Sequence, residues 1–329
     1  MKIFVLLFVI GVSVSLTAQN TKNGLSNIDN TSSQAVIIKY YDNDYKRSDV
    51  FANPLYRFAS YEAGTYSILV TFNEITGAKM IPPVVDFTMR KGSGKIAEIE
   101  DYSINGNKSF KIQYYRGIID PVINENLVYR IPYPVGHDVT VTTCYKFIQL
   151  NRSEMLSSIP FTTFSSGHKD TVFAMRKGVI VELSFNNNSN NKIISSKGIV
   201  VQNLSKGNYL IVEHTDGTLA MYSGLTANDE SKLKVGTKVF PDTYLGETGM
   251  LKDGIYSVST CIYYPTRDRD KTSEKYTIKQ AYIDPLYATD KGNIRLANQM
   301  SYKPAVYEAI ITAEMSKKEA KEHQDRQHK

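Results

Sequence analysis

Short runs of β-branched and aromatic residues, separated by turn residues, dominate the chain from about residue 35 onward. The first part contains AVIIKYY from Ala35, GTYSILVTF from Gly64 and KSFKIQYY from Lys108, with an Asn105-Gly106 turn between two such runs. Runs of this kind bounded by turn residues are typical of β-strands, and no stretch repeats with a helical period. The pattern predicts an all-β, sandwich-like domain over residues 34–126.

A second set of strand-like runs predicts another β-sheet domain over residues 127–290. It contains HDVTVTTCYKF, GVIVELSF, NYLIVEH, TLAMYSGL and IYSVSTCIYY. Beyond Pro304 the pattern changes to Ala, Glu and Lys with alternating charge, which predicts a solvated helical tail over residues 304–329 that frays at its end. His323 and His328 lie in this tail, and we expect them to be tail residues rather than ligands. The predicted fold class is therefore mainly β with a C-terminal helical tail.

The N-terminus has the features of a secretory signal peptide over residues 1–18. Lys2 precedes an apolar run from Ile3 to Val14, and small or polar residues follow up to Ala18. The run is short for a membrane span, so a retained N-terminal anchor is the less favoured alternative. We expect an exported protein, in the periplasm, the cell envelope or the medium, with no transmembrane anchor after cleavage. A polar, flexible lead-in follows over residues 19–33.

Charge and cysteine content restrict the partners and the chemistry. The net charge is +6, which is too weak for a nucleic-acid footprint, so no nucleic-acid partner is expected. The chain has only two cysteines, Cys144 and Cys261, each in an apparent strand. They form a disulfide if those strands are neighbours in an oxidising compartment, or they are two buried thiols. Both interpretations stay open.

Four segments in consistent order, between Tyr129 and Pro265, carry a family resemblance. They are YRIPYPVGHDVTVT, DTVFAMRKGVIVEL, NYLIVEHTDGTLAMYSGL and KVGTKVFPDTYLGETG. This region resembles the LytM or lysostaphin-type zinc endopeptidases, whose core is a β-sheet domain of the duplicated hybrid motif type. Active members hold zinc with a histidine and an aspartate near the first strand and with a histidine in a later His-x-His strand. Another histidine, in a Tyr-x-His-Leu segment, assists the water that the metal activates.

The residues that this resemblance implies are missing from the chain. The aspartate position falls on Thr163, and no histidine lies upstream of it between Leu150 and Ile159. The Tyr-x-His-Leu segment is Tyr222 to Leu225, with Gly224 in place of the imidazole. The strand Ile255 to Thr260 contains no histidine in either register. We therefore expect no catalytic residue, no metal ligand and no cofactor, and an inactive relative of these peptidases rather than an enzyme.

The histidines that remain in the body of the protein have plainer interpretations. His214 matches a position where family members often carry a histidine outside the metal shell, so we expect it to pack or to form a hydrogen bond. His168, with Asp170, is expected in a solvated turn, and His137, with Asp138, in the turn that starts a strand. The three histidines come from different segments without a closely spaced pair, so we do not expect them to gather round one zinc ion.

Inactive members of the family are associated with binding cell-wall peptides or with controlling wall amidases. The resemblance thus predicts a non-catalytic binding or regulatory module of the cell envelope, whose partner is a peptidoglycan peptide or a cell-wall hydrolase. The groove left by the missing ligands would be lined by Thr163, His214, Tyr222, Tyr256 and Ser257.

Two alternatives belong to other functional classes. The first is a zinc metalloendopeptidase that acts on cell-wall peptides with non-standard ligands, drawn from His168, Asp170 and His214, in which case zinc is the cofactor. The second is a structural or adhesion β protein. The sequence contains no Gly-x-Ser-x-Gly, no phosphate-binding loop and no His-Glu-x-x-His motif, so other common hydrolase classes are not indicated.

Overall fold

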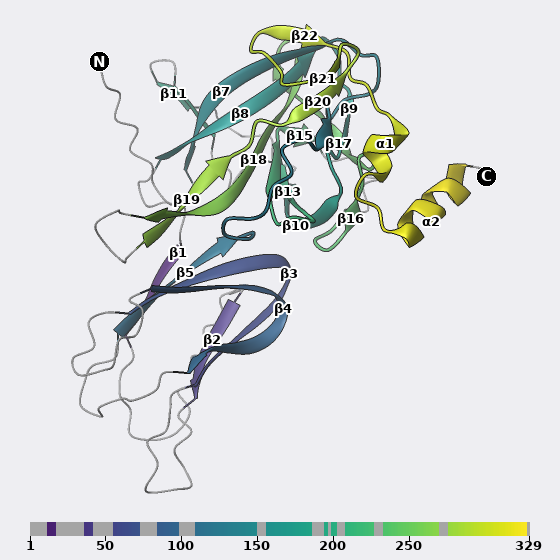
Figure 1. Ribbon diagram of the computed structural model, residues 1–329. Coiled ribbons are helices and arrows are strands. Elements are labelled where there is room, and N and C mark those ends of the chain that lie inside the picture. The colour runs from purple at the N-terminus through teal and green to yellow at the C-terminus, as the bar shows by residue number, and fades with distance from the viewer. Residues whose placement is uncertain are drawn as a thin grey trace, which may run out of the picture. The chain divides into compact units, whose positions relative to one another are not determined.

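The structure is a computed structural model, shown in Figure 1, and it describes eleven stretches of the chain. These are residues 12–17, 36–41, 55–72, 84–98, 109–149, 156–185, 194–196, 199–202, 208–226, 233–269 and 276–327. Residues 1–11 of the predicted signal peptide, the predicted lead-in and His328 lie outside the described residues. Among the described helices, none is long and apolar enough to cross a membrane.

The chain divides into two compact units, and the first contains residues 9–119 and 265–279. We call it the N-terminal unit. Its described strands form one five-stranded sheet in the order β1-β5-β3-β2, with β4 paired to β3. The strands are β1 (Val12–Thr17), β2 (Val36–Tyr41), β3 (Leu55–Phe72), β4 (Val84–Glu98) and β5 (Ser109–Arg116). Strand β1 coincides with the end of the predicted signal segment and pairs with β5.

Residues 265–279 were expected in the second domain, but they pack with the N-terminal strands. Ile278 is fully buried in a small core with Leu69, Tyr115 and other apolar residues. The guanidinium of Arg267 pairs with the carboxylate of Asp86 at 2.6 Å. Burial of apolar surface and an ion pair therefore both tie this segment to the N-terminal unit.

The second unit contains residues 120–264 and 280–329, and we call it the C-terminal unit. Its main sheet has fourteen strands, with a central path β11-β12-β7-β8-β18-β14-β13-β10-β16, and a separate sheet has the order β21-β20-β6. The first strands are β6 (Val128–Arg130), β7 (Val139–Gln149), β8 (Leu156–Ser166), β9 (Thr171–Phe173), β10 (Gly178–Ser184), β11 (Ile194–Ser196), β12 (Ile199–Gln202), β13 (Tyr209–His214) and β14 (Leu219–Ser223). The others are β15 (Leu225–Thr226), β16 (Lys238–Val239), β17 (Tyr244–Lys252), β18 (Ile255–Arg269), β19 (Tyr276–Tyr282), β20 (Leu286–Thr289), β21 (Gly292–Ile294) and β22 (Met300–Tyr302). The end of β18 and the start of β19 belong to residues 265–279 of the N-terminal unit. The prediction of a mainly β fold is confirmed.

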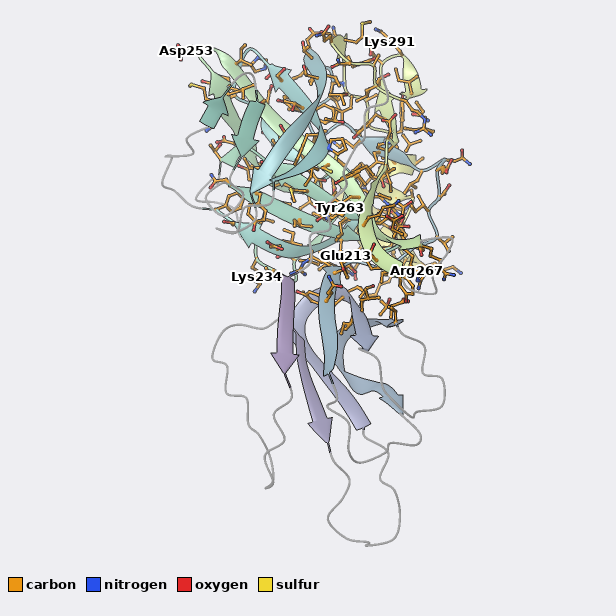
Figure 2. All side chains as sticks on the ribbon, turned by 90° about the vertical axis from the view of Figure 1, so that its left-hand side faces the viewer. Glu213, Lys234, Asp253, Tyr263, Arg267 and Lys291 are labelled. Carbon is orange, nitrogen blue, oxygen red and sulfur yellow. The ribbon has the colours of Figure 1, made fainter. Side chains whose placement is uncertain are left out.

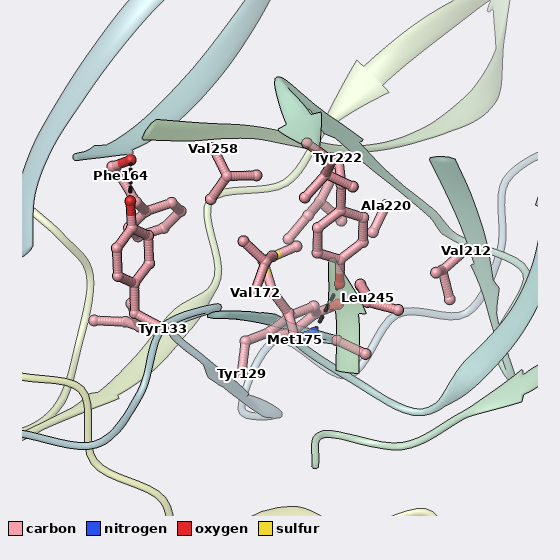
Figure 3. Packing of buried hydrophobic residues seen from close by; sticks show 14 of the residues in the cluster. Tyr129, Tyr133, Phe164, Val172, Met175, Val212, Ala220, Tyr222, Leu245 and Val258 are labelled. Atoms are coloured by element: carbon pink, nitrogen blue, oxygen red, sulfur yellow. Dashed lines mark hydrogen bonds between the residues drawn. The ribbon is translucent and has the colours of Figure 1, made fainter. Parts of the chain in front are cut away.

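Buried tyrosines form much of the core of the C-terminal unit, and their hydroxyl groups are hydrogen-bonded. The hydroxyl of Tyr133 donates to the carbonyl of Phe164 at 2.9 Å, and that of Tyr222 accepts from the backbone N–H of Met175 at 2.7 Å (Figure 3). Both tyrosines are fully buried. A tyrosine can be buried at little cost only when its hydroxyl finds a partner, so these bonds explain how a chain without tryptophan fills its core with tyrosine.

The C-terminal tail is helical, as predicted, but it is held against the sheet. Helices α1 (Glu308–Thr312) and α2 (Lys317–Gln327) flank Glu314, whose carboxylate receives two hydrogen bonds of 2.7 Å from the guanidinium of Arg176. Glu319 of α2 pairs with Lys177 at 2.8 Å. His323 is buried, with Nε2 3.2 Å from the carboxylate of Glu308. Most residues of α2 are exposed, as expected of a solvated tail. The ion pairs with Arg176 and Lys177 nevertheless hold the tail on the sheet, which the sequence pattern did not predict.

We predict that Arg176→Met lowers the free energy of unfolding by about 3–5 kcal/mol, because it leaves the nearly buried carboxylate of Glu314 without its positively charged partner and with only the hydroxyl of Thr215. Denaturant unfolding of the two proteins measures the difference. The control is Lys318→Ala, which breaks the exposed pair with Glu322 and should cost less than about 1 kcal/mol. Equal losses in the two variants would contradict the proposed role of Arg176.

Candidate functional site

Thr163, where the resemblance would place an aspartate ligand, has Ser259 and Ser223 beside it on neighbouring strands of the main sheet. Thr163 of β8 is opposite Ser259 of β18, and Ser259 is opposite Ser223 of β14. Residues directly opposite each other in antiparallel strands point to the same face of a sheet, so the three form a row of hydroxyl groups. We call Thr163, Ser259 and Ser223 the hydroxyl row.

The hydroxyl row is buried and hydrogen-bonded within itself. Each of the three residues is less than a tenth exposed, and the hydroxyls of Thr163 and Ser259 share a hydrogen bond of 2.8 Å. A neutral hydroxyl is a poor ligand for zinc, which takes thiolate, imidazole or carboxylate. The donor set of this row does not fit zinc.

Gly224, in the position of the assisting histidine, has a backbone that suits glycine. Its φ is +86°, in the left-handed region that L residues with a side chain rarely adopt. A Cβ atom built there would lie 3.5 Å from the carbonyl oxygen of Ser257, so space is available and the conformation is the obstacle. The backbone at this position therefore favours glycine over histidine.

His214 and Tyr222 do not line a groove, so this part of the prediction is wrong. Tyr222 is fully buried in the core, where Figure 3 shows its hydroxyl directed at the backbone of Met175. His214 is also buried, with Nδ1 2.9 Å from the hydroxyl of Thr218 and its ring at the edge of Tyr129. The expectation that His214 packs and forms a hydrogen bond is confirmed. Of the other groove residues, Ser257 is buried and Tyr256 is half-buried.

Burial sets the charge state of His214. Loss of hydration lowers the pKa of its imidazole from 6.5 to about 3, and the positive charge of Arg176 acts in the same direction. His214 is therefore neutral near neutral pH, and its Nε2 is buried without a hydrogen-bond partner.

The structure brings His137, His168 and Asp170 together at the end of the β7–β8 hairpin. His137 Nδ1 lies 2.8 Å from Asp170 Oδ1, and His168 Nε2 lies 3.2 Å from the same oxygen. The two histidines were expected in separate turns, so their convergence corrects that interpretation. His214 is not part of this cluster, so the ligand set His168, Asp170 and His214 is not assembled. We call His137, His168 and Asp170 the histidine cluster.

The pairing of β7 with β8 explains why the histidine cluster forms. Thr140 pairs with Ser165, and the register runs without a shift to Gln149 and Leu156. His137 lies two residues before β7 begins and His168 two residues after β8 ends, so the same register places them opposite each other. The sequence shows both histidines, but it does not show the register that aligns them.

Asp170 is the fixed member of the histidine cluster. Its backbone N–H donates to the hydroxyl of Thr248 at 2.9 Å, and its carbonyl accepts from the backbone N–H of Thr248 at 2.8 Å. Its second carboxylate oxygen, Oδ2, accepts a 2.8 Å hydrogen bond from the hydroxyl of Ser166. One carboxylate oxygen is thus held by the protein, and the other faces the two imidazoles.

The structure does not form the disulfide that the sequence left open. Cys261 is a free, buried thiol, and burial raises its pKa. Cys144 lies on β7 and Cys261 on β18, with β8 between these strands. Two strands separated by a third are about 10 Å apart, which is beyond the span of a disulfide.

No family model matches the chain, and comparison with curated proteins gives no match. Among solved structures, Helicobacter pylori Csd3 is similar to 76% of this chain over 72% of its own, with 11% sequence identity and a TM-score of 0.26.

We predict that Gly224→Ala lowers the free energy of unfolding by about 1 kcal/mol, because alanine must adopt the left-handed conformation. The matched control is Gly167→Ala, where an added Cβ meets nothing within 4 Å, and there the change should stay within about 0.5 kcal/mol. Denaturant unfolding compares the three proteins. If Gly224→Ala were as stable as the wild type, the backbone conformation at residue 224 would also suit a residue with a side chain.

We also predict an acid-sensitive component of stability that comes from His214. Below pH 6.5 the unfolded chain binds a proton at this residue, whereas the folded chain does not until about pH 3, so stability falls as pH falls through this window. The expected slope is about 1.4 kcal/mol per pH unit, and it should be absent in His214→Phe. Unfolding measured between pH 6 and pH 4 tests this, with the exposed His168→Asn as control. Identical slopes in wild type and His214→Phe would rule out the assignment.

Proposed function

We propose that this chain is a non-catalytic module of the cell envelope, of LytM type, that binds cell-wall peptides. The observation that carries the proposal is the hydroxyl row. Thr163 stands in the expected aspartate position, Ser259 lies in the strand expected to carry a histidine ligand, and Ser223 lies beside Ser259. The three neutral hydroxyls are buried, two of them are hydrogen-bonded to each other, and together they give zinc no anionic or imidazole ligand. Without the metal, no hydroxide forms near neutral pH at this place.

Gly224 supports the same conclusion from a second position. The family's histidine there assists the attacking water, and its replacement by glycine in a left-handed conformation removes both the imidazole and the backbone that would carry it. A return to catalysis at this site would need new ligands on β8 and β18 together with a new backbone conformation at residue 224.

The β17–β18 hairpin, at the start of the strand that carries Ser259, presents an accessible surface. Tyr256 is half-buried and pairs with Ser166 at the end of β8. Met250, Leu251 and Ile255 are exposed apolar residues near the turn of the hairpin, where Figure 2 labels Asp253 at the edge of the C-terminal unit. An aromatic ring next to exposed apolar side chains can pack against a cell-wall peptide, so we assign peptide binding to this hairpin.

We expect the full chain to co-sediment with purified peptidoglycan sacculi and to release no soluble fragments from them. Tyr256→Ala should weaken binding about tenfold, which corresponds to about 1.4 kcal/mol, because it removes the aromatic contact. Sedimentation at increasing protein concentration gives the affinity, and chromatography of the supernatant detects fragments.

Tyr307→Ala is the matched control, since Tyr307 is an exposed tyrosine at the start of α1 and lies outside the hairpin. Its affinity should equal that of the wild type. Release of peptide fragments that a chelator stops would contradict the proposal and favour the zinc endopeptidase alternative. Absence of sedimentation would also contradict it and favour a structural or adhesion protein.

A further inference from the structure

We propose that the histidine cluster, His137, His168 and Asp170, binds one divalent transition-metal ion, with zinc preferred. This site is separate from the hydroxyl row, where the LytM resemblance would place a metal, and it does not rest on the proposed function. It is the one group of three or more His, Cys, Asp or Glu residues with converging ligand atoms that the described part of the chain contains.

The spacing of the three ligand atoms fits a tetrahedral ion. His137 Nδ1 and Asp170 Oδ1 are 2.8 Å apart, His168 Nε2 and Asp170 Oδ1 are 3.2 Å apart, and the two nitrogens are 3.5 Å apart. Zinc bonds of about 2.0–2.2 Å at tetrahedral angles place neighbouring ligand atoms about 3.3–3.5 Å from each other. Only the shortest separation must widen, by about 0.5 Å, and the 40% exposed side chain of His137 has room to move.

The surroundings of Asp170 favour a cation. Its side chain is only 3% exposed, and burying an ionised carboxylate is costly unless positive charge or hydrogen bonds compensate it. Its described partners are a hydroxyl and two imidazoles. The neighbouring ammonium of Lys169 pairs with Glu247 instead. A metal ion would supply the charge, and the hydrogen bond from Ser166 to Oδ2 would orient the carboxylate as an outer-shell partner.

The ligand types select the metal and leave one position open. Two imidazole nitrogens and one carboxylate oxygen suit zinc and similar transition metals better than magnesium or calcium, which prefer oxygen ligands. The side chains of His137 and His168 are 40% and 62% exposed, so the fourth position faces solvent. Three protein ligands with an open position can hold a water molecule or an anionic group of a bound molecule.

Isothermal titration of the full chain with zinc chloride tests the proposal, with magnesium and calcium chloride as comparisons. We expect one equivalent of zinc to bind and neither of the other ions to compete at equal concentration. His168→Asn should weaken zinc binding at least tenfold, and Ser166→Ala should weaken it about 10- to 100-fold, the range found for outer-shell partners. Cobalt(II) should give the intense visible absorption of a tetrahedral complex, which His168→Asn abolishes.

Lys169→Gln is the matched control, because it changes the same loop without removing a ligand, and it should leave zinc binding unchanged. Asp170→Asn removes the third ligand, but it can destabilise the loop. The decisive comparison is therefore zinc binding by the wild type and by the variant of the exposed His168. Circular dichroism verifies that each variant is folded. Absence of zinc binding, or equal binding by wild type and His168→Asn, would overturn the proposal. Neither result depends on sedimentation with sacculi, so the metal site and the peptide binding are tested independently of each other.

Discussion

The register of β8, β18 and β14 decides what the C-terminal unit can do. It places Phe164, Val258 and Tyr222 on one face of the sheet, in the core, and the hydroxyl row on the other. Because side chains alternate along a strand, a shift of one residue would place the three hydroxyls in this core and move the apolar residues to the opposite face. Apolar burial therefore fixes this register, and the register brings the hydroxyls of Thr163 and Ser259 together.

Much of this arrangement could be predicted from the sequence because it is local or follows chain order. The TDG turn and its flanking runs predict the β13–β14 hairpin, in which Glu213 pairs with Leu219. Counting from DTVFAMRKGVI identified Thr163, whose hydroxyl does meet Ser259. His214 ends β13 and Tyr222 lies on β14, and nearly all residues of both strands are buried. The pattern could not predict the burial of these two side chains, since polar and aromatic residues also occur at sheet surfaces. The docking of the tail was missed for a related reason, because Arg176 and Glu314 are far apart in the chain.

The histidine cluster could not be predicted from the sequence. His168 and Asp170 are close in the sequence, but His137 joins them only through the pairing of β7 with β8. Residues 150–155 separate the two strands, and the length of that connection does not reveal the register. Strand β8 therefore carries Thr163 of the hydroxyl row, and the histidine cluster lies just beyond its end. The two places differ in chemistry, since one offers neutral hydroxyls and the other offers imidazoles and a carboxylate.

Anomalous X-ray scattering at the zinc absorption edge, from crystals of the full chain soaked in zinc, shows whether the histidine cluster or the hydroxyl row holds a metal ion. It locates every bound zinc ion, whatever its effect on activity. We expect one strong peak bounded by His137, His168 and Asp170, and no peak beside Thr163 and Ser259. A peak at the hydroxyl row would contradict the proposal that its three neutral hydroxyls cannot hold zinc.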